Sequence, residues 1–520
     1  MNRRECGARL ACATVCIGVA LASSACAGDS PPRDRGGAEP GTIRLLYEGG
    51  DLDIFNPAWD DSPKFLLFQP LATRTGSSCV EPAGSLAERW ERSDDWLTWT
   101  VTLRSDVRWH DGTPVTARDV VFNLELWRHP DVGWYGGSEV AEAEAMDERT
   151  VRLRLHRPGS WPLDGWYVFF PAHHLEAREP ARFFEWDYWQ RPIGNGPFRY
   201  VRHVPETMVE LEANPDYPGG RPAIERVIIR FRGGSPTTEL LAGNIDLAQM
   251  DPLQATRLAS DPRFRVYYGL QGTANWVAWN HRDPRFADPR VRRAMAHAVD
   301  RRALAASLAF PDGLPITDAP MTPCQRDADT HTEPWPHDPA EALRLLEEAG
   351  WRDSDGDGIL DREGQPFRFP LISAANNERA AVFLEEQLRR IGIIAELRVL
   401  DRSLAHRRFQ EGNFAAIIPT AVHSEWTIAQ HASPIGPVDE ALADLLDAAR
   451  AEPDPARGTE LMMEAGKRYR DLAPAMFLHF RTGALVAHRR VQGLGEPGTL
   501  LARQGWRWPF GGLEHLWIEE

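Results

Sequence analysis

The chain has 520 residues, of which 42% are hydrophobic and 26% are charged. This composition is ordinary for a globular protein, and the length predicts two or three lobes rather than one core. The formal net charge of −16 repels phosphate backbones, so we expect no nucleic-acid partner. The 19 tryptophans are a surplus. They fit either apolar cores or a cleft that holds its ligand by stacking on indole rings.

The N-terminus has the parts of an export signal. Three arginines lie within the first nine residues, residues 10–22 are mostly small and apolar, and small residues precede Cys26. The apolar stretch is too short to span a bilayer stably, so residues 1–25 are predicted to be a signal peptide. The segment resembles the lipobox of bacterial lipoproteins, which implies a lipid on Cys26, although Ser23 stands where lipoboxes usually have Leu. An ordinary cleaved signal peptide is the alternative.

Residues 26–40 are dense in Pro, Gly and charge and lack apolar periodicity, which predicts a flexible tether. Once the signal peptide is removed, Cys79 and Cys324 are the cysteines that remain besides Cys26. Export permits a disulfide between them, and the sequence leaves a bridge and two free thiols both open. No C-x-x-C pair is present in the sequence, so a cysteine-based metal or redox site has no support.

Apolar periodicity and capping residues predict the elements that follow in chain order. They are strands at 43–47 and 96–103, a helix at 117–127, strands at 150–155 and 226–231, helices at 291–308, 339–349 and 377–391, and a strand at 394–400. Thr116 and Asp119 are expected to form a capping box, and Gly350 and Gly392 to end the last two helices. The alternation of strands and helices after residue 288 predicts an α/β lobe.

The sequence contains no G-x-S-x-G, H-E-x-x-H or Walker A pattern. We therefore expect no catalytic residues, no cofactor and no metal, and an exported hydrolase with an unrecognised acid/base pair is a competing class. His173 and His174 are adjacent, so their side chains are expected to point in different directions. Residues 353–361 place carboxylates at positions 1, 3, 5 and 9 of a calcium-type loop, but position 12 is Gly364 instead of Glu. We expect this loop to be mainly structural, and leave calcium binding open.

A string of local patterns runs along the chain in a fixed order. It includes L-A-E-R-W at 86–90, V-R-W-H-D-G-T-P-V at 107–115, and further stretches at 97–104, 192–198, 211–217, 243–247, 279–280, 288–301 and 338–351. Together these patterns resemble the extracellular solute-binding family that serves peptide, dipeptide and nickel ABC importers. The resemblance covers roughly residues 43–495.

The resemblance implies an α/β fold of the periplasmic-binding-protein type, in the large type II variant with three domains and two lobes around a ligand cleft. Lobe I would combine residues 41–74, 191–280 and 483–520, domain II would be 75–190, and lobe III would be 281–482. The implied function is that of a substrate-binding lipoprotein, not an enzyme, which delivers its ligand to the permease and ATPase subunits of an ABC importer. We expect a monomer in the periplasm or at the cell surface, anchored to the membrane by its lipid.

The family binds its ligand between the lobes, which implies six contact residues here: Trp59, Trp276, Asn280, His423, Glu425 and Trp426. Peptide-binding members hold the ligand's ammonium with an aspartate in a Trp-x-x-Asp-Tyr-x-Asp-Pro-like stretch. The stretch after Phe414 has no such motif, and Glu425 is the carboxylate in its place. The expected ligand is a peptide or a similar small polar solute. An oligosaccharide, a nickel complex or another non-peptide solute is the alternative, and a chaperone on the same fold is a third class.

Overall fold

The structure is a computed structural model. It describes residues 40–47, 55, 63–75, 81–132, 140–156, 158, 168–231, 234–312, 316, 318, 333–419, 435, 439–452, 455–495 and 512–519. These residues belong to one compact unit, Glu39–Glu520. Within these ranges, no helix is both long and apolar enough to cross a membrane. The three cysteines singled out above, Cys26, Cys79 and Cys324, lie outside them.

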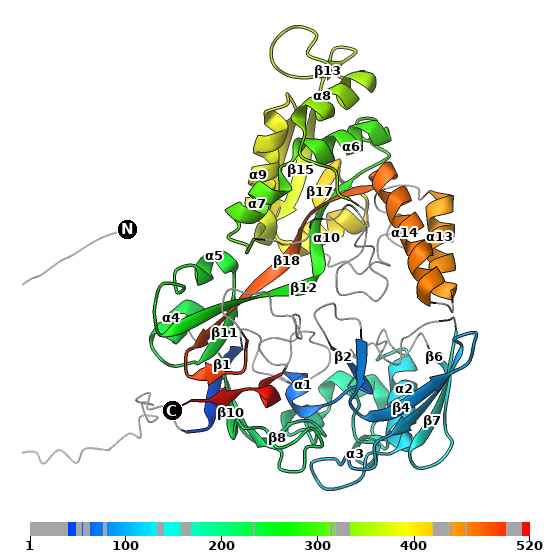
Figure 1. The fold of residues 1–520 in the computed structure, drawn as a ribbon, viewed down its shortest axis with the longest axis vertical. Helices are drawn as coiled ribbons and strands as arrows, with labels where there is room; N and C mark the ends of the chain where they lie inside the picture. Colours follow the sequence, from blue (N-terminus) through cyan, green and yellow to red (C-terminus); the bar gives the residue numbers. More distant parts are fainter. Residues whose placement is uncertain are drawn as a thin grey trace, which may run out of the picture. The chain divides into compact units, whose positions relative to one another are not determined.

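The largest sheet has ten strands drawn from distant parts of the chain (Figure 1). Their order across the sheet is β16-β15-β17-β12-β18-β11-β1-β10-β9-β8. Their bounds are β1 Thr42–Tyr47, β8 Phe198–Val204, β9 Met208–Ala213, β10 Arg226–Phe231, β11 Leu247–Met250, β12 Phe264–Trp279, β15 Arg368–Ala374, β16 Ile394–Leu400, β17 Ala416–Ile418 and β18 Ala475–His488. β1 pairs in parallel with β10 and β11, and β15 pairs in parallel with β16 and β17. The sheet therefore contains two separate groups of parallel strands.

The long antiparallel strands β12 and β18 join these two groups, as Figure 1 shows. β18 pairs with β11 on one side of the sheet, and β12 pairs with β17 on the other. Their mutual register shifts between Leu270 and Ala274 and again between Asn275 and Trp276. Because bulges bend and twist a strand, these shifts mark the places where the pair departs from a regular ladder.

A second sheet of four antiparallel strands has the order β4-β5-β7-β6. The bounds are β4 Ala87–Arg92, β5 Thr98–Leu103, β6 Val140–Ala145 and β7 Thr150–Leu155. In β5 and β7 every second side chain is buried, so the sheet has one apolar face, and helix α2 (Ala117–Arg128) packs on β6 and β7. The predicted capping box begins this helix, with Thr116 N donating to Asp119 Oδ2 over 2.8 Å.

The remaining elements are mostly helices around these two sheets. They are α1 Lys64–Leu67, α3 Ala172–Leu175, α4 Pro236–Leu241, α5 Pro252–Ala255, α6 Pro289–Ala298, α7 Arg301–Ser307, α8 Pro339–Glu348, α9 Glu378–Arg389, α10 Arg402–Gln410, α13 Glu440–Ala451 and α14 Pro455–Leu472, with short strand pairs β2–β3 (Ala72–Thr75, Glu81–Gly84), β13–β14 (Asp361–Arg362, Gln365–Pro366) and β19–β20 (Val491–Gln492, Trp517–Ile518). Short 3-10 segments lie at η3 Pro180–Glu185, η4 Asp187–Gln190, η5 Ala375–Asn377 and η6 Leu513–His515.

The predicted strands and helices are confirmed, with one exception. The helix expected over 291–308 is wrong as a single element, because the chain forms α6 and α7 with a break at Val299 and Asp300. Asp300 is the N-cap of α7, and its carboxylate accepts a hydrogen bond from Ala303 N over 2.9 Å. A capping aspartate satisfies an amide that would otherwise lack a partner, so this residue favours a new helix start over continuation.

A buried ion cluster holds the start of β1 against the end of β18. Arg44 donates to both carboxylate oxygens of Asp246 over 3.0 Å, and Arg490 donates to Asp246 Oδ1 over 3.0 Å and to Thr42 O over 3.0 Å. The Asp246 side chain is 2% exposed. Burial alone would raise the pKa of Asp246, but the hydrogen bonds from Arg44 and Arg490 outweigh it and lower the pKa below its usual range.

Replacing this carboxylate tests its contribution. Asp246→Asn leaves two guanidinium groups without their charge partner, and we expect the free energy of unfolding to fall by about 3–5 kcal/mol. The matched control is Asp216→Asn, which removes an exposed ion pair with Arg199 and should cost less than about 1 kcal/mol. Urea unfolding of both variants provides the measurement. Equal, small losses would show that the buried cluster does not stabilise the fold.

The same cluster predicts a pH dependence. Because the folded-state pKa of Asp246 is depressed, its stabilisation is present above the unfolded pKa of about 3.9 and is lost as the pH falls through the folded pKa. The Asp246→Asn variant should lack this part of the acid transition.

Candidate functional site

The carboxyl ends of the parallel strands define the candidate site. β11 ends at Met250 and β15 ends at Ala374, one in each parallel group. In α/β sheets, ligands bind outside the carboxyl ends of parallel strands, because side chains and helix starts converge there. In this chain the paired strands β12 and β18 pass between the two groups.

A cavity of about 360 Å³ lies at this place. It is lined by residues from the end of β11 and the start of α5, from β12 and β18, from the chain after α7, and from η5 and α9: Gln249, Met250, Asp251, Pro252, Asn275, Leu308, Phe310, Asn376, Asn377, Arg379, Ala380, His479, Thr482 and Gly483. More than half of these residues have polar side chains. The volume is within the range of sites that hold small molecules.

A cross-strand pair of polar side chains lies on one wall of the cavity. Asn275 of β12 is the register partner of His479 of β18, and Asn275 Nδ2 lies 3.2 Å from His479 Nε2. His479 Nδ1 lies 3.0 Å from the carbonyl oxygen of Phe480, which can only accept, so Nδ1 carries a proton. In a neutral imidazole Nε2 is then the acceptor of the Asn275 amide proton. The ring of Phe310 packs edge-on against His479, with centroids 4.8 Å apart.

An ion pair connects the two parallel groups across the same cavity. Arg379 Nη2 of α9 lies 3.5 Å from Asp251 Oδ2, and Asp251 is the N-cap of α5. Both side chains are about half exposed, at 52% and 42%, so the pair contributes little to stability. Asn377, at the start of α9, donates to the carbonyl of Pro419 just beyond β17 over 3.4 Å. These contacts place hydrogen-bond donors and acceptors from both groups of parallel strands around the cavity.

The described lining of the cavity consists mainly of groups that form hydrogen bonds. Its described charged side chains are Asp251 and Arg379, and these face each other. Amide, hydroxyl and imidazole groups supply the remaining polar atoms. A small polar solute that exchanges hydrogen bonds with these groups fits this chemistry.

Two of the residues expected to touch ligand are described, and both have structural contacts. Trp276 is 1% exposed, packs edge-on against Phe409 with centroids 5.7 Å apart, and belongs to the core around α10, α13 and α14. Asn280 Nδ2 donates to Phe414 O over 2.7 Å and to Gly412 O over 3.2 Å, and its Oδ1 accepts from Arg282 N. Neither residue lines the cavity, so their ligand contacts stay predictions.

The other four expected contacts, Trp59, His423, Glu425 and Trp426, lie outside the described residues. Sequence reasoning selected β12 but not Asn275, the residue before Trp276, and it did not select His479. The available signal was an isolated polar residue within an apolar strand, in T-A-N-W-V-A-W and in A-M-F-L-H-F. His479 is buried and Asn275 is partly buried, and a buried polar side chain needs a partner, which Asn275 supplies for His479.

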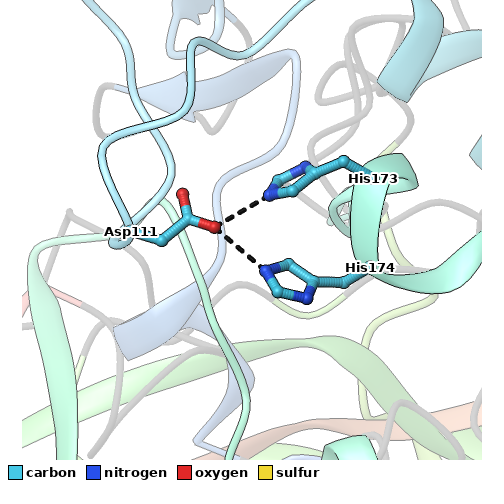
Figure 2. A group of neighbouring side chains, drawn as sticks. All are labelled: Asp111, His173 and His174. Atoms are coloured by element: carbon cyan, nitrogen blue, oxygen red, sulfur yellow. Dashed lines mark hydrogen bonds and ion pairs between the residues drawn. The ribbon is translucent and has the colours of Figure 1, made fainter.

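The structure corrects the expectation about His173 and His174. Both lie on α3, and both imidazoles face the same carboxylate oxygen of Asp111, with Nε2 atoms 2.8 Å and 3.0 Å away (Figure 2). The side chains therefore converge instead of pointing apart. Together with Asp111 they form a group that could ligate a metal ion.

The acidic loop is a second such group, formed by Asp353, Asp355 and Asp357. Its carboxylates accept hydrogen bonds from the loop's own backbone. Asp353 accepts from Gly356 N and Gly358 N, and Asp357 accepts from Ile359 N. These bonds account for the turn without an ion, and calcium binding stays untested.

Comparison with known proteins places this geometry in a family. The profile described as "Bacterial extracellular solute-binding proteins, family 5 Middle" matches residues 81–427, more than half of the chain. A Brucella ovis protein provisionally named as an ABC transporter peptide-binding protein is 34% identical over 285 residues, which are 52% of this chain and 53% of that protein. The chain thus spans about half the length of the first curated relatives it matches. The oligopeptide-binding protein AppA of Bacillus subtilis is 26% identical over 78% of both chains.

Solved structures agree on the fold. The Bacillus subtilis AppA complex with a nonapeptide superposes with a TM-score of 0.69 at 21% identity, covering 92% of this chain and 99% of that one. NikZ of Campylobacter jejuni in complex with Ni(L-His) gives 0.72 at 20% identity, covering 92% and 100%. The expected periplasmic-binding-protein-like α/β fold with two lobes is confirmed by these neighbours. The chain belongs to the bacterial extracellular solute-binding proteins, family 5.

Proposed function

We propose that the chain is the substrate-binding component of an ABC importer and binds a peptide or similar small polar solute. The observation that carries the proposal is the polar cavity at the carboxyl ends of β11 and β15, in a chain of this family. The Brucella and Bacillus relatives are named as peptide-binding proteins, which supports binding without chemical change of the ligand.

The proposed organisation follows the two sheets. Lobe I would combine residues 41–74, 191–280 and 483–520, domain II would be 75–190, and lobe III would be 281–482. β12 and β18 would then be the crossing segments, and their register shifts would allow a hinge motion that closes the cavity. The Asp251–Arg379 ion pair, which joins α5 to α9, is a contact that such closure would tighten.

A peptide ligand would be recognised by hydrogen bonds and by charge. Asn275, held in place by its hydrogen bond to His479, would exchange hydrogen bonds with the ligand backbone from the crossing strands. Glu425 would accept the ligand's ammonium, and His423, Trp426, Trp59, Trp276 and Asn280 are the further proposed contacts. A charge-assisted hydrogen bond between carboxylate and ammonium is among the stronger polar contacts available.

A non-peptide solute is the second candidate. The Ni(L-His) complex bound by the Campylobacter jejuni neighbour supports it, since the fold also holds compact metal chelates. An oligosaccharide is a further possibility within this candidate, because tryptophan faces stack well on sugar rings.

Truncating Asn275 tests the cavity. Asn275→Ala removes a cavity donor and leaves His479 without this partner, so we expect peptide affinity to fall about tenfold, in line with the roughly 1–3 kcal/mol cost of an unsatisfied buried polar group. Titration calorimetry with a defined peptide mixture gives the affinity. The exposed His406→Gln on α10 is the control and should bind as the unmodified chain does. Unchanged affinity in Asn275→Ala would place the ligand elsewhere.

Changing Glu425 separates the two ligand classes. If the ligand is a peptide, Glu425→Gln should weaken binding of a free-amine peptide by on the order of 2–5 kcal/mol, because it removes the partner of a buried charge. An N-acetylated peptide should bind the unmodified chain poorly and respond little to the change. Glu411→Gln, at an exposed position, is the matched control. If Trp426→Ala weakens binding more than Glu425→Gln does, a stacked sugar-like ligand is favoured and the ammonium contact is refuted.

We also propose that Cys26 is acylated and anchors the chain to the membrane. Cys26→Ala should release soluble protein or leave an unprocessed precursor, whereas Cys16→Ala, inside the proposed signal peptide, should change neither. Membrane fractionation and intact-mass measurement follow both outcomes. A Cys26→Ala chain that is processed and membrane-bound as before would refute the anchor.

A further inference from the structure

A carboxylate and two imidazoles converge outside the cavity described above. The Nε2 atoms of His173 and His174 lie 2.8 Å and 3.0 Å from Asp111 Oδ2, and the three potential ligand atoms all lie within 4.8 Å of one another (Figure 2). None of the three residues lines the cavity between β11 and α9. This cluster therefore needs a separate explanation.

The turn that carries Asp111 and the helix that carries the two histidines are each held by hydrogen bonds of their own. Asp111 Oδ1 accepts from Thr113 N over 2.9 Å, so one carboxylate oxygen is held by the turn and the other faces the histidines. Gly112 has φ +90°, a conformation that favours glycine and allows this tight turn. On the other side, Asp119 Oδ1 of α2 accepts from Ala172 N over 2.8 Å and fixes the start of α3. Such outer contacts orient metal ligands in known sites.

The ligand atoms suit a divalent transition metal ion. Two imidazole nitrogens and one carboxylate oxygen form the ligand set of many zinc sites, with metal–ligand distances of about 2.0–2.2 Å. Tetrahedral geometry at those distances separates ligand atoms by about 3.3 Å. The two spacings from Asp111 Oδ2 to the imidazoles, 2.8 Å and 3.0 Å, would need to widen by about 0.3–0.5 Å, and the third spacing is within 4.8 Å. The three side chains are 27–40% exposed, which leaves them free to make this adjustment and open to solvent.

The cluster presents one carboxylate oxygen, Asp111 Oδ2, to both imidazoles. The neighbouring His110 is directed elsewhere, with Nδ1 accepting from Gly194 N and Nε2 facing Gly196 O, both over 3.1 Å.

We propose that Asp111, His173 and His174 form a binding site for one divalent transition metal ion, such as Zn²⁺ or Co²⁺, in the part of the chain that contains α2, α3 and the four-stranded sheet. The ion replaces the two hydrogen bonds between the imidazoles and Asp111 and joins α3 to the turn around Gly112. Three protein ligands leave a fourth position open to water. The site shares no residue with the described lining of the cavity, so we expect metal uptake without added solute.

Metal titration of the full chain, prepared without a polyhistidine tag, tests this proposal. Zn²⁺ calorimetry should show one ion per chain at this site, and Co²⁺ should give the visible absorption of a four- or five-coordinate ion with nitrogen ligands. His174→Gln and His173→Gln should each weaken this uptake at least tenfold. His406→Gln removes an exposed histidine of α10 and should leave it unchanged.

The melting temperature gives an independent readout. Zn²⁺ should raise it by about 2 °C in the unmodified chain at saturation, and a chelator should reverse the rise. Asp111→Asn keeps the shape but removes the charge, and serves if a histidine variant fails to fold. Uptake and melting shifts that are identical in all these variants, or absent from the unmodified chain, would overturn the proposal and leave a hydrogen-bonded contact only.

Discussion

The antiparallel pairing of β12 with β18 is the constraint on which the rest of the structure depends. Each parallel group of strands needs a neighbour to complete its edge, and these two long strands supply it for both groups. They also carry the polar pair Asn275 and His479 to the place where the carboxyl ends of β11 and β15 meet one cavity. The cavity has walls that belong to different groups of strands, so its shape would change if the pair bent.

Buried ion pairs connect the strands of the large sheet to neighbouring segments. Asp246, held by Arg44 and Arg490, fixes β1 and the end of β18. A second buried pair joins Arg301 of α7 to Asp318, 2.6 Å apart, and Arg301 also donates to the carbonyl of Phe477 in β18 over 3.3 Å. Burying such charges is costly unless each is fully paired, so removing one partner from either cluster would be destabilising. The half-exposed Asp251–Arg379 pair, in contrast, lies where a change of arrangement would cost little.

Patterns within a few neighbouring residues made much of the fold predictable. The features that the sequence did not predict depend mostly on contacts between residues that lie far apart in the chain. The capping box at Thr116, the helix end at Gly350 and the strand over 150–155 are read from a few neighbouring residues, and each was confirmed. The break at Asp300 was missed because apolar periodicity continues across it. Asn275 contacts His479, which lies 204 residues later in the sequence, and Asp111 contacts His173, which lies 62 residues later. No local sequence pattern could have paired residues so far apart. The tryptophan surplus did not mark the cavity, since Trp109, Trp127 and Trp189 are among the largest fully buried side chains.

The central claim is that this chain binds a small polar solute and releases it unchanged. Native mass spectrometry of the chain, as purified and after incubation with a defined peptide mixture, tests it most directly. The account predicts one small molecule per chain, recovered after release with its mass unaltered however long the incubation. Accumulation of a product of different mass would contradict it by indicating an enzyme. A chain that retains none of the offered peptides or other polar solutes would contradict it as well.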